Sequence, residues 1–215
     1  PAAKRWEGEG CAPAAHTPHP SAADAAPSLS PEGRGALPNA KHEAYRYSNI
    51  AALHRIWHDL PAADTITLGA NESAQHVWLP DGSDVGVRKC VVDLAPGASL
   101  SVFALNGAAD YRRIELDVTV REGAHFALHA ANIAGGKANQ EIVTIVRHEE
   151  PEGTSNQVVR SVLGGTSTGS YLGKVAVARN AQKVDGEQSV KAMLLDRGVT
   201  ANCKPELEIY ADDVK

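Results

Sequence analysis

The sequence lacks the features of several large protein classes. It carries 21 basic against 26 acidic side chains over 215 residues, so it has no basic excess of the kind that general nucleic-acid binding requires. No apolar run approaches the roughly 18–20 residues that cross a bilayer. Lys4 and Arg5 lead into Trp6-Glu7-Gly8-Glu9 instead of an apolar stretch, so we expect no signal peptide. The sequence therefore predicts a protein that binds neither nucleic acid nor membrane.

Cysteines and aromatic residues are also scarce. Cys11, Cys90 and Cys203 are an odd number without a CxxC pair, which excludes a disulfide framework and a zinc ribbon and favours a reducing, cytoplasmic setting. Only three Trp, five Tyr and two Phe are present, although 43% of the residues are hydrophobic. The core must therefore consist mainly of Ala, Val, Leu and Ile, which favours a thin and regular interior.

The first 40 residues have a different composition from the rest. They hold seven of the twelve prolines and eleven alanines. Because proline removes backbone donors and blocks helix interiors, we expect residues 1–40 to form a disordered tail. His16 and His19 have an HxxH spacing that suits metal binding on a helix, but Pro18 and Pro20 prevent a helix there. We therefore expect no metal site in the tail.

Residues 41–64 carry a helical pattern. Ser48 or Asn49 can cap the helix, and Pro61 ends it. One face collects the apolar residues Ile50, Leu53, Ile56, Trp57 and Leu60. This pattern predicts a helix whose apolar face packs on the main domain.

From about Thr65 onward the pattern changes to a period of two. In 113–120 apolar residues alternate with Arg113, Glu115, Asp117 and Thr119, which predicts one buried and one solvated face. Further strand-like runs lie at 124–130, 142–146, 158–163, 175–178, 190–195 and 207–210, separated by Gly- and Pro-containing turns. No helix is long enough for a βαβ crossover, so an all-β fold follows, either a sandwich or barrel or a β-helix. The few aromatics and the small Ala127, Ala176 and Ala178 favour a β-helix core over 65–215.

The histidines of this region do not form a metal site in the predicted strands. His125 and His129 share a strand face opposite Phe126, but a rise of about 3.3 Å per residue places them about 13 Å apart. We expect both to face solvent. His148 precedes the acidic stretch 149–152, and we expect a solvated acidic turn there instead of a catalytic pair.

Motifs for common enzyme classes are missing. The Gly/Ser/Thr stretch 164–170 has no GxSxG pattern, and Lys174 is followed by Val175 where a P-loop needs Ser or Thr. Asp212 and Asp213 are adjacent, so in a strand they point to opposite faces and give little support to a glycosidase. The lone thiol of Cys203 is the one weak candidate for a metal ligand.

The last 45 residues are similar to a known family. The stretches YLGKVAV (171–177) and AQKVD (181–185) are followed by PELEIYADDVK (205–215). Together with EAYRYSNI (43–50), they resemble the SufB/SufD family of iron–sulfur cluster assembly proteins, most closely its SufD branch. The most specific motif consists of Pro205, Glu206, Leu207, Glu208, Ile209, Tyr210, Ala211, Asp212 and Asp213.

This resemblance implies a right-handed parallel β-helix and a non-catalytic scaffold subunit of a SufB–SufC–SufD complex. SufC is the ATPase of that complex, and SufD pairs with SufB through the end of its β-helix. The iron–sulfur cluster would be transient and belong to the complex, with no cofactor bound by this chain. The family's Cys/His segment and C-terminal helices lie past Lys215, so no cluster ligand is carried over to this sequence.

The resemblance leads to two expectations about binding, and two other functions are alternatives to it. We expect 207–214 to form a late edge strand that pairs weakly with SufB or with a second copy of the chain, and we expect no binding to SufC without the later helices. The alternatives are a β-helix carbohydrate-active enzyme, which would need acids clustered on adjacent coils, and a β-helical protein-interaction module.

Overall fold

The computed structural model describes residues 37–39 and 41–214, which form two parallel β-sheets and a short helical segment. Of the tail predicted over residues 1–40, residues 1–36 and 40, with Cys11, His16 and His19, lie outside the described residues. None of the helices in the described part of the chain has the length and apolar character needed to cross a membrane.

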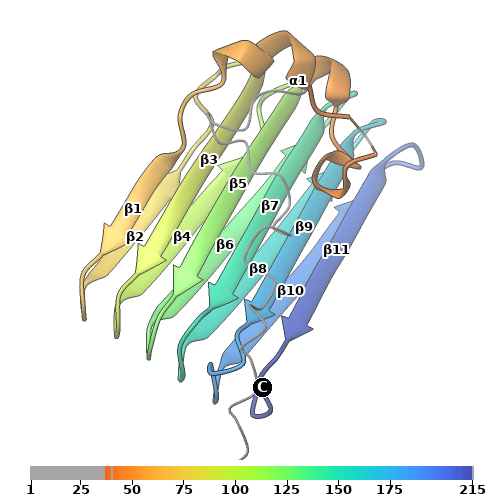
Figure 1. Ribbon diagram of the computed structural model, residues 1–215. Helices are drawn as coiled ribbons and strands as arrows, with labels where there is room; N and C mark the ends of the chain where they lie inside the picture. The colour runs from red at the N-terminus through yellow and green to blue at the C-terminus, as the bar shows by residue number, and fades with distance from the viewer. Residues whose placement is uncertain (1–36, 40, 215) are drawn as a thin grey trace, which may run out of the picture.

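The strands alternate between the two sheets along the chain (Figure 1). The six-stranded sheet holds β1 (Asp64–Leu68), β3 (Val85–Leu94), β5 (Tyr111–Val120), β7 (Asn139–His148), β9 (Thr168–Val177) and β11 (Thr200–Ile209). The five-stranded sheet holds β2 (Ser73–Trp78), β4 (Ser99–Asn106), β6 (His125–Ala134), β8 (Thr154–Leu163) and β10 (Asp185–Leu194).

Each strand pairs in parallel with the strand two places away. Val85 is opposite Tyr111, and Tyr111 is opposite Asn139, so these coils are 26 and 28 residues long, and each contributes one strand to each sheet. Five such coils, followed by β11, make a parallel β-helix, which confirms the predicted fold class. The predicted strand cores lie in or at the ends of the observed strands, but β11 begins at Thr200, seven residues before the predicted start.

The core consists of ladders of aliphatic side chains between the two sheets. One set of residues aligned in register across three strands is Cys90, Leu116 and Thr144. The next inward positions, two residues further along each strand, hold Val92, Val118 and Val146. All six are buried. Each fully buried Leu or Val stabilises the fold by roughly 1.5–3 kcal/mol. The scarcity of aromatics fits this narrow interior.

Stacked glycines form one corner of the β-helix. Gly165 has φ +71°, and a Cβ added there would lie 2.7 Å from the carbonyl oxygen of Gly136 in the preceding coil. Only glycine fits this conformation and this close approach of backbones. Two of the Gly-containing turns predicted between the strand-like runs are thus confirmed, at Gly135-Gly136 and Gly164-Gly165, and they set the spacing between coils.

The N-terminal segment lies on the outside of the six-stranded sheet, at the end where its strands begin (Figure 1). It contains η3 (Glu43–Tyr45), α1 (Ile50–Ile56) and η4 (Trp57–Asp59). Asn49 caps α1 by accepting a 3.0 Å hydrogen bond from the Ala52 amide. The apolar side chains that pack together under the segment are Ala44, Tyr45, Ala52, Leu53, Trp57, Leu60 and Tyr111. The predicted docking helix is confirmed, although its last turn is a 3₁₀-helix.

Candidate functional site

The last two strands of the chain are β11, which ends the six-stranded sheet, and β10, which ends the five-stranded sheet. Together they are called the last coil. Leu207 is opposite Val175, and Leu194 is opposite Leu163, so both leucines point toward the interior. Val175 and Leu163 are fully buried, whereas Leu207 and Leu194 are 55% and 53% exposed. Since no described strand stacks on β10 or β11, interior-facing apolar side chains are accessible at this end of the β-helix.

The family motif 205–213 forms the second half of β11 and the bend after it. Leu207 and Ile209 point inward, and the alternating acidic residues point outward. Glu206 contacts Lys204 at 2.6 Å, and Glu208 contacts Lys174 on β9 at 2.8 Å. These exposed ion pairs contribute at most about 1 kcal/mol each.

The bend after β11 folds back onto the turn before β10. The amide of Tyr210 donates to the Val177 carbonyl at 3.0 Å, and the amide of Asp213 donates to the Gln182 side-chain oxygen at 3.0 Å. Lys183 in turn donates its amide to the Asp213 carbonyl at 2.6 Å. The adjacent carboxylates of Asp212 and Asp213 are exposed, and this stretch holds the end of β11 in place through its backbone.

A buried polar group lies directly inside the last coil. The Tyr171 hydroxyl lies 3.1 Å from Gln157 Oε1, 2.9 Å from Gln188 Oε1 and 3.2 Å from Thr144 Oγ1. Burial raises the pKa of Tyr171 to about 12, so the phenol stays protonated and donates. The interior thus changes from aliphatic to polar toward β11. Apart from the presence of Tyr171 in a family motif, no sequence pattern predicted this polar group.

Cys203 points inward beside Tyr171 but is exposed, because it lies on the last strand. Partial burial raises the pKa of its thiol, which disfavours the thiolate that a metal would need. Within the described residues, no three His, Cys, Asp or Glu side chains gather closely enough to hold a metal ion. A ligand role for Cys203 remains a prediction.

The histidines divide into two groups. His129 is exposed and stacks on Phe103 with 5.1 Å between ring centroids, while half-buried His125 bonds Thr154 Oγ1 through Nδ1 at 2.7 Å. The acidic turn predicted after His148 is confirmed, with Glu149 exposed and Glu150 half-buried. His148 itself occupies an inward position, is fully buried, and lies 2.9 Å from Ser155 Oγ. Burial lowers its pKa to about 4.

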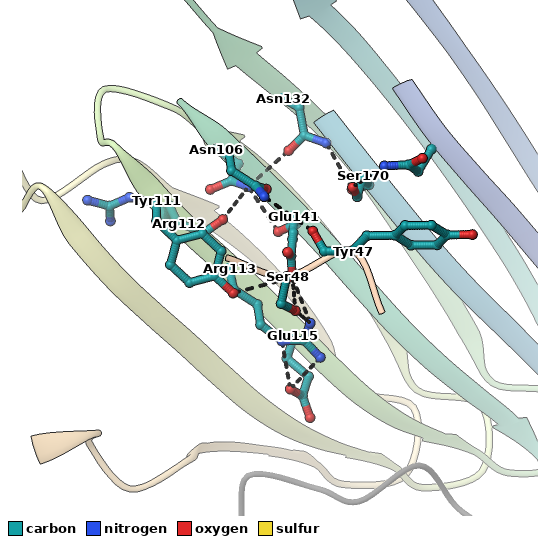
Figure 2. Close-up of polar contacts among 12 residues, drawn as sticks. Tyr47, Ser48, Asn106, Tyr111, Arg112, Arg113, Glu115, Asn132, Glu141 and Ser170 are labelled. Carbon is teal, nitrogen blue, oxygen red and sulfur yellow. Dashed lines mark hydrogen bonds and ion pairs between the residues drawn. The ribbon is translucent and has the colours of Figure 1, made fainter. Parts of the chain in front are cut away.

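One expectation was wrong: Arg113 and Glu115 were assigned to a solvated face. Both are buried, because the N-terminal segment covers this part of the sheet. Figure 2 shows the Arg113 guanidinium between two carboxylates, with Nη1 2.8 Å from Glu141 Oε2 and Nε 3.3 Å from Glu115 Oε2. The Ser48 hydroxyl also donates to Glu141 Oε2 at 2.9 Å, which links the segment to the cluster.

The opposite charges in this buried cluster stabilise one another. Burial opposes the charge on Arg113, but the carboxylates of Glu115 and Glu141 outweigh this effect and hold the pKa of Arg113 above its ordinary value. The Tyr45 ring lies 5.2 Å from the guanidinium carbon and covers it from the N-terminal segment. The cluster therefore fixes the segment to β5 and β7.

Comparison with known proteins identifies a family that matches the β-helical part of the chain. A family model described as "SUF system FeS cluster assembly, SufBD core domain" matches residues 66–215. The chain belongs to this family. The SufBD core domain thus corresponds to the β-helix, including the last coil with its 205–213 motif.

Curated relatives of this SufBD chain show the same similarity. The iron-sulfur cluster assembly protein SufD of Escherichia coli (strain K12) is 26% identical over 178 residues, 80% of this chain and 42% of the relative. The SufBD family protein slr0076 of Synechocystis is 26% identical over 70% of this chain and 34% of its own length. Protein ABCI7, chloroplastic, of Arabidopsis thaliana is 37% identical over 68 residues, 31% of this chain and 14% of its own. The chain spans less than half the length of each of these relatives.

Proposed function

We propose that this chain is a non-catalytic scaffold subunit for iron–sulfur cluster assembly that works in the cytoplasm with a SufB-type protein and a SufC-type ATPase. The observation that carries the proposal is the SufBD core-domain match over the whole β-helix. The similarity to a protein named iron-sulfur cluster assembly protein SufD also supports it. The cluster is cargo that forms transiently in the complex, and ATP hydrolysis belongs to the SufC-type partner.

The last coil is the surface through which this scaffold pairs with the SufB-type protein. On the side of β11 where no described strand pairs with it, backbone N–H and C=O groups can bond an added strand, and Leu207 and Ile209 add apolar area beside it. The bend at 211–214 is held to the preceding coil, so the edge is already ordered. A strand from the partner would extend the six-stranded sheet and cover the exposed leucines.

The experiment measures binding and cluster formation together. The chain, a SufB-type protein and their mixture are compared by size-exclusion chromatography with light scattering, and each sample is then reconstituted anaerobically with iron and sulfide. We expect a mixed complex, and we expect a stable cluster chromophore only in the complex. Self-association of the chain alone would use the same edge. The chain alone should release no phosphate from ATP.

A pair of substitutions locates the interface. Leu207→Asp places a charge on the proposed interface and should weaken the complex at least tenfold, which corresponds to about 1.4 kcal/mol. Val77→Asp is the matched control, because Val77 is also an exposed aliphatic residue (64% against 55% for Leu207) but lies on β2 at the opposite end of the β-helix. Absence of any mixed complex, or equal loss in both variants, would contradict pairing through the last coil.

A further inference from the structure

The outermost strand of the six-stranded sheet, β11, has one backbone side bonded to β9 and one side that no described strand covers (Figure 1). At its start, the amide of Thr200 donates to the Ser167 carbonyl at 2.9 Å. Just after its end, the amide of Tyr210 donates to the Val177 carbonyl at 3.0 Å. Because successive residues of a strand turn their hydrogen-bonding groups to opposite sides, the even-numbered residues of β11 face β9. The odd-numbered residues within 201–209 therefore turn their backbone groups to the uncovered side.

Pro205 is one of these odd-numbered residues, and its side chain is exposed. Proline has no backbone N–H, so a sheet tolerates it where the missing donor faces an unpaired side. It costs β11 no bond to β9, because only the even-numbered residues bond to β9. On the uncovered side it leaves a gap in the row of donors. A strand added along the whole of β11 would therefore have a carbonyl opposite Pro205 without a donor, which is unfavourable.

The two stretches of β11 on either side of Pro205 differ in what they offer to an added strand. After Pro205, Leu207 and Ile209 have interior-facing side chains that are exposed, so a strand added there would cover apolar surface. The bend that follows holds the end of this stretch to the preceding coil. Before Pro205, the interior-facing positions hold the smaller Ala201 and Cys203. The stretch after Pro205 is therefore the more favourable one for strand pairing.

We propose that Pro205 determines which strands pair with β11. A strand added to β11 bonds to Leu207 and Ile209 and does not continue past Pro205, so it is short and turns apolar side chains toward the interior. Two copies of this chain are likewise kept from pairing along the whole of β11, since each would bring a proline to the pair. This role rests on the pairing of the last coil with a SufB-type protein proposed above, and it adds the position and length of the partner's strand. The neighbouring edge strand β10 contains no proline, so the restriction belongs to β11.

The first test uses the chain alone and so does not depend on the scaffold function. Pro205→Ala restores the missing donor, and sedimentation velocity over a range of concentrations measures self-association. We expect the association constant to rise by about tenfold or more, because each copy in the pair gains a hydrogen bond. Pro61→Ala is the matched control, since Pro61 is also exposed but lies before β1 at the opposite end of the β-helix. No rise in the Pro205 variant, or an equal rise in both variants, would overturn the proposal.

Amide hydrogen exchange, followed by NMR, locates the pairing within β11. In the complex of the wild type with a SufB-type protein, exchange at Leu207 and Ile209 should slow by about tenfold or more, while Ala201 and Cys203 keep their rates. In the complex of Pro205→Ala, the protection should extend to Cys203.

Two results in a complex that forms would overturn the proposal. One is protection of Ala201 and Cys203 in the wild type, and the other is unchanged exchange at Leu207 and Ile209. If no complex forms, the scaffold function fails, and the self-association of the Pro205 variant still decides the role of Pro205.

Discussion

Arg113 on β5 and Glu141 on β7 form an ion pair with a 2.8 Å contact, and both side chains are essentially inaccessible to solvent. The pair joins neighbouring coils, and through Ser48 and Tyr45 it also joins the β-helix to the N-terminal segment. Such a pair is costly to bury, but it is still more costly to break, because the remaining charge has no partner.

Arg113→Met should lower the free energy of unfolding by about 3–5 kcal/mol, because it leaves Glu141 buried and charged. Arg121→Met is the control, since Arg121 pairs with Asp93 at the surface, and its loss should cost at most about 1 kcal/mol. Urea unfolding followed by circular dichroism measures both. Adding Glu141→Leu to Arg113→Met should restore much of the loss, because Glu115 keeps the buried Lys89 as its partner. Similar small losses in the two single variants would show that the buried pair is not a structural requirement.

Two leucines that both point inward should respond differently to truncation. Leu116→Ala removes a fully buried side chain and should cost about 2–5 kcal/mol. Leu207→Ala changes an interior-facing but exposed side chain and should cost less than about 1 kcal/mol in the chain alone. In the complex with a SufB-type protein, the second variant should also weaken binding. Equal destabilisation in the isolated chain would mean that Leu207 is already covered.

The period of two was enough to predict the all-β fold, because the interior of a β-helix buries alternate residues such as Leu116 and Val118. It did not predict burial on the outer face of the sheet. Arg113 and Glu115 are buried by a segment more than fifty residues away in sequence, and no local pattern contains that contact. His148 could have been predicted, because it has the same parity as Val146 and therefore points inward. The start of β11 could not have been predicted, because residues 200–204 show no apolar alternation.

The buried cluster also predicts how the N-terminal segment opens. Ser48→Ala removes the hydroxyl that donates to Glu141, and it should increase amide hydrogen exchange of α1 more than that of β5. Lys204→Ala removes an exposed contact to Glu43 at the other end of the segment and is expected to change exchange at η3 alone. Uniform acceleration across the β-helix in the Ser48 variant would indicate that the segment does not open as a separate unit.

The buried His148 should make the stability of the folded chain sensitive to acid. Its pKa is about 4 in the folded chain, against 6.5 for an ordinary histidine, because burial disfavours the charged ring. Between these values the unfolded chain binds more protons than the folded chain, so stability rises with pH from 4 to 6.5 and is constant above that range. Acidification from pH 7 to 4.5 should therefore remove about 2–3 kcal/mol through this residue.

Urea unfolding of the wild type and of His148→Gln at several pH values measures this contribution. The variant should lose the dependence between pH 6.5 and 4.5 that belongs to His148, whatever its stability at pH 7, because glutamine does not titrate. His129→Gln is the control, since His129 is exposed and its removal should leave the wild-type slope intact. Carboxylates paired in the folded chain, such as Asp81 with Arg112, titrate at lower pH and add their own loss below that interval. If the His148 variant retained the full slope while the His129 variant lost it, the proton would bind at the surface, and burial of His148 would not control the acid response.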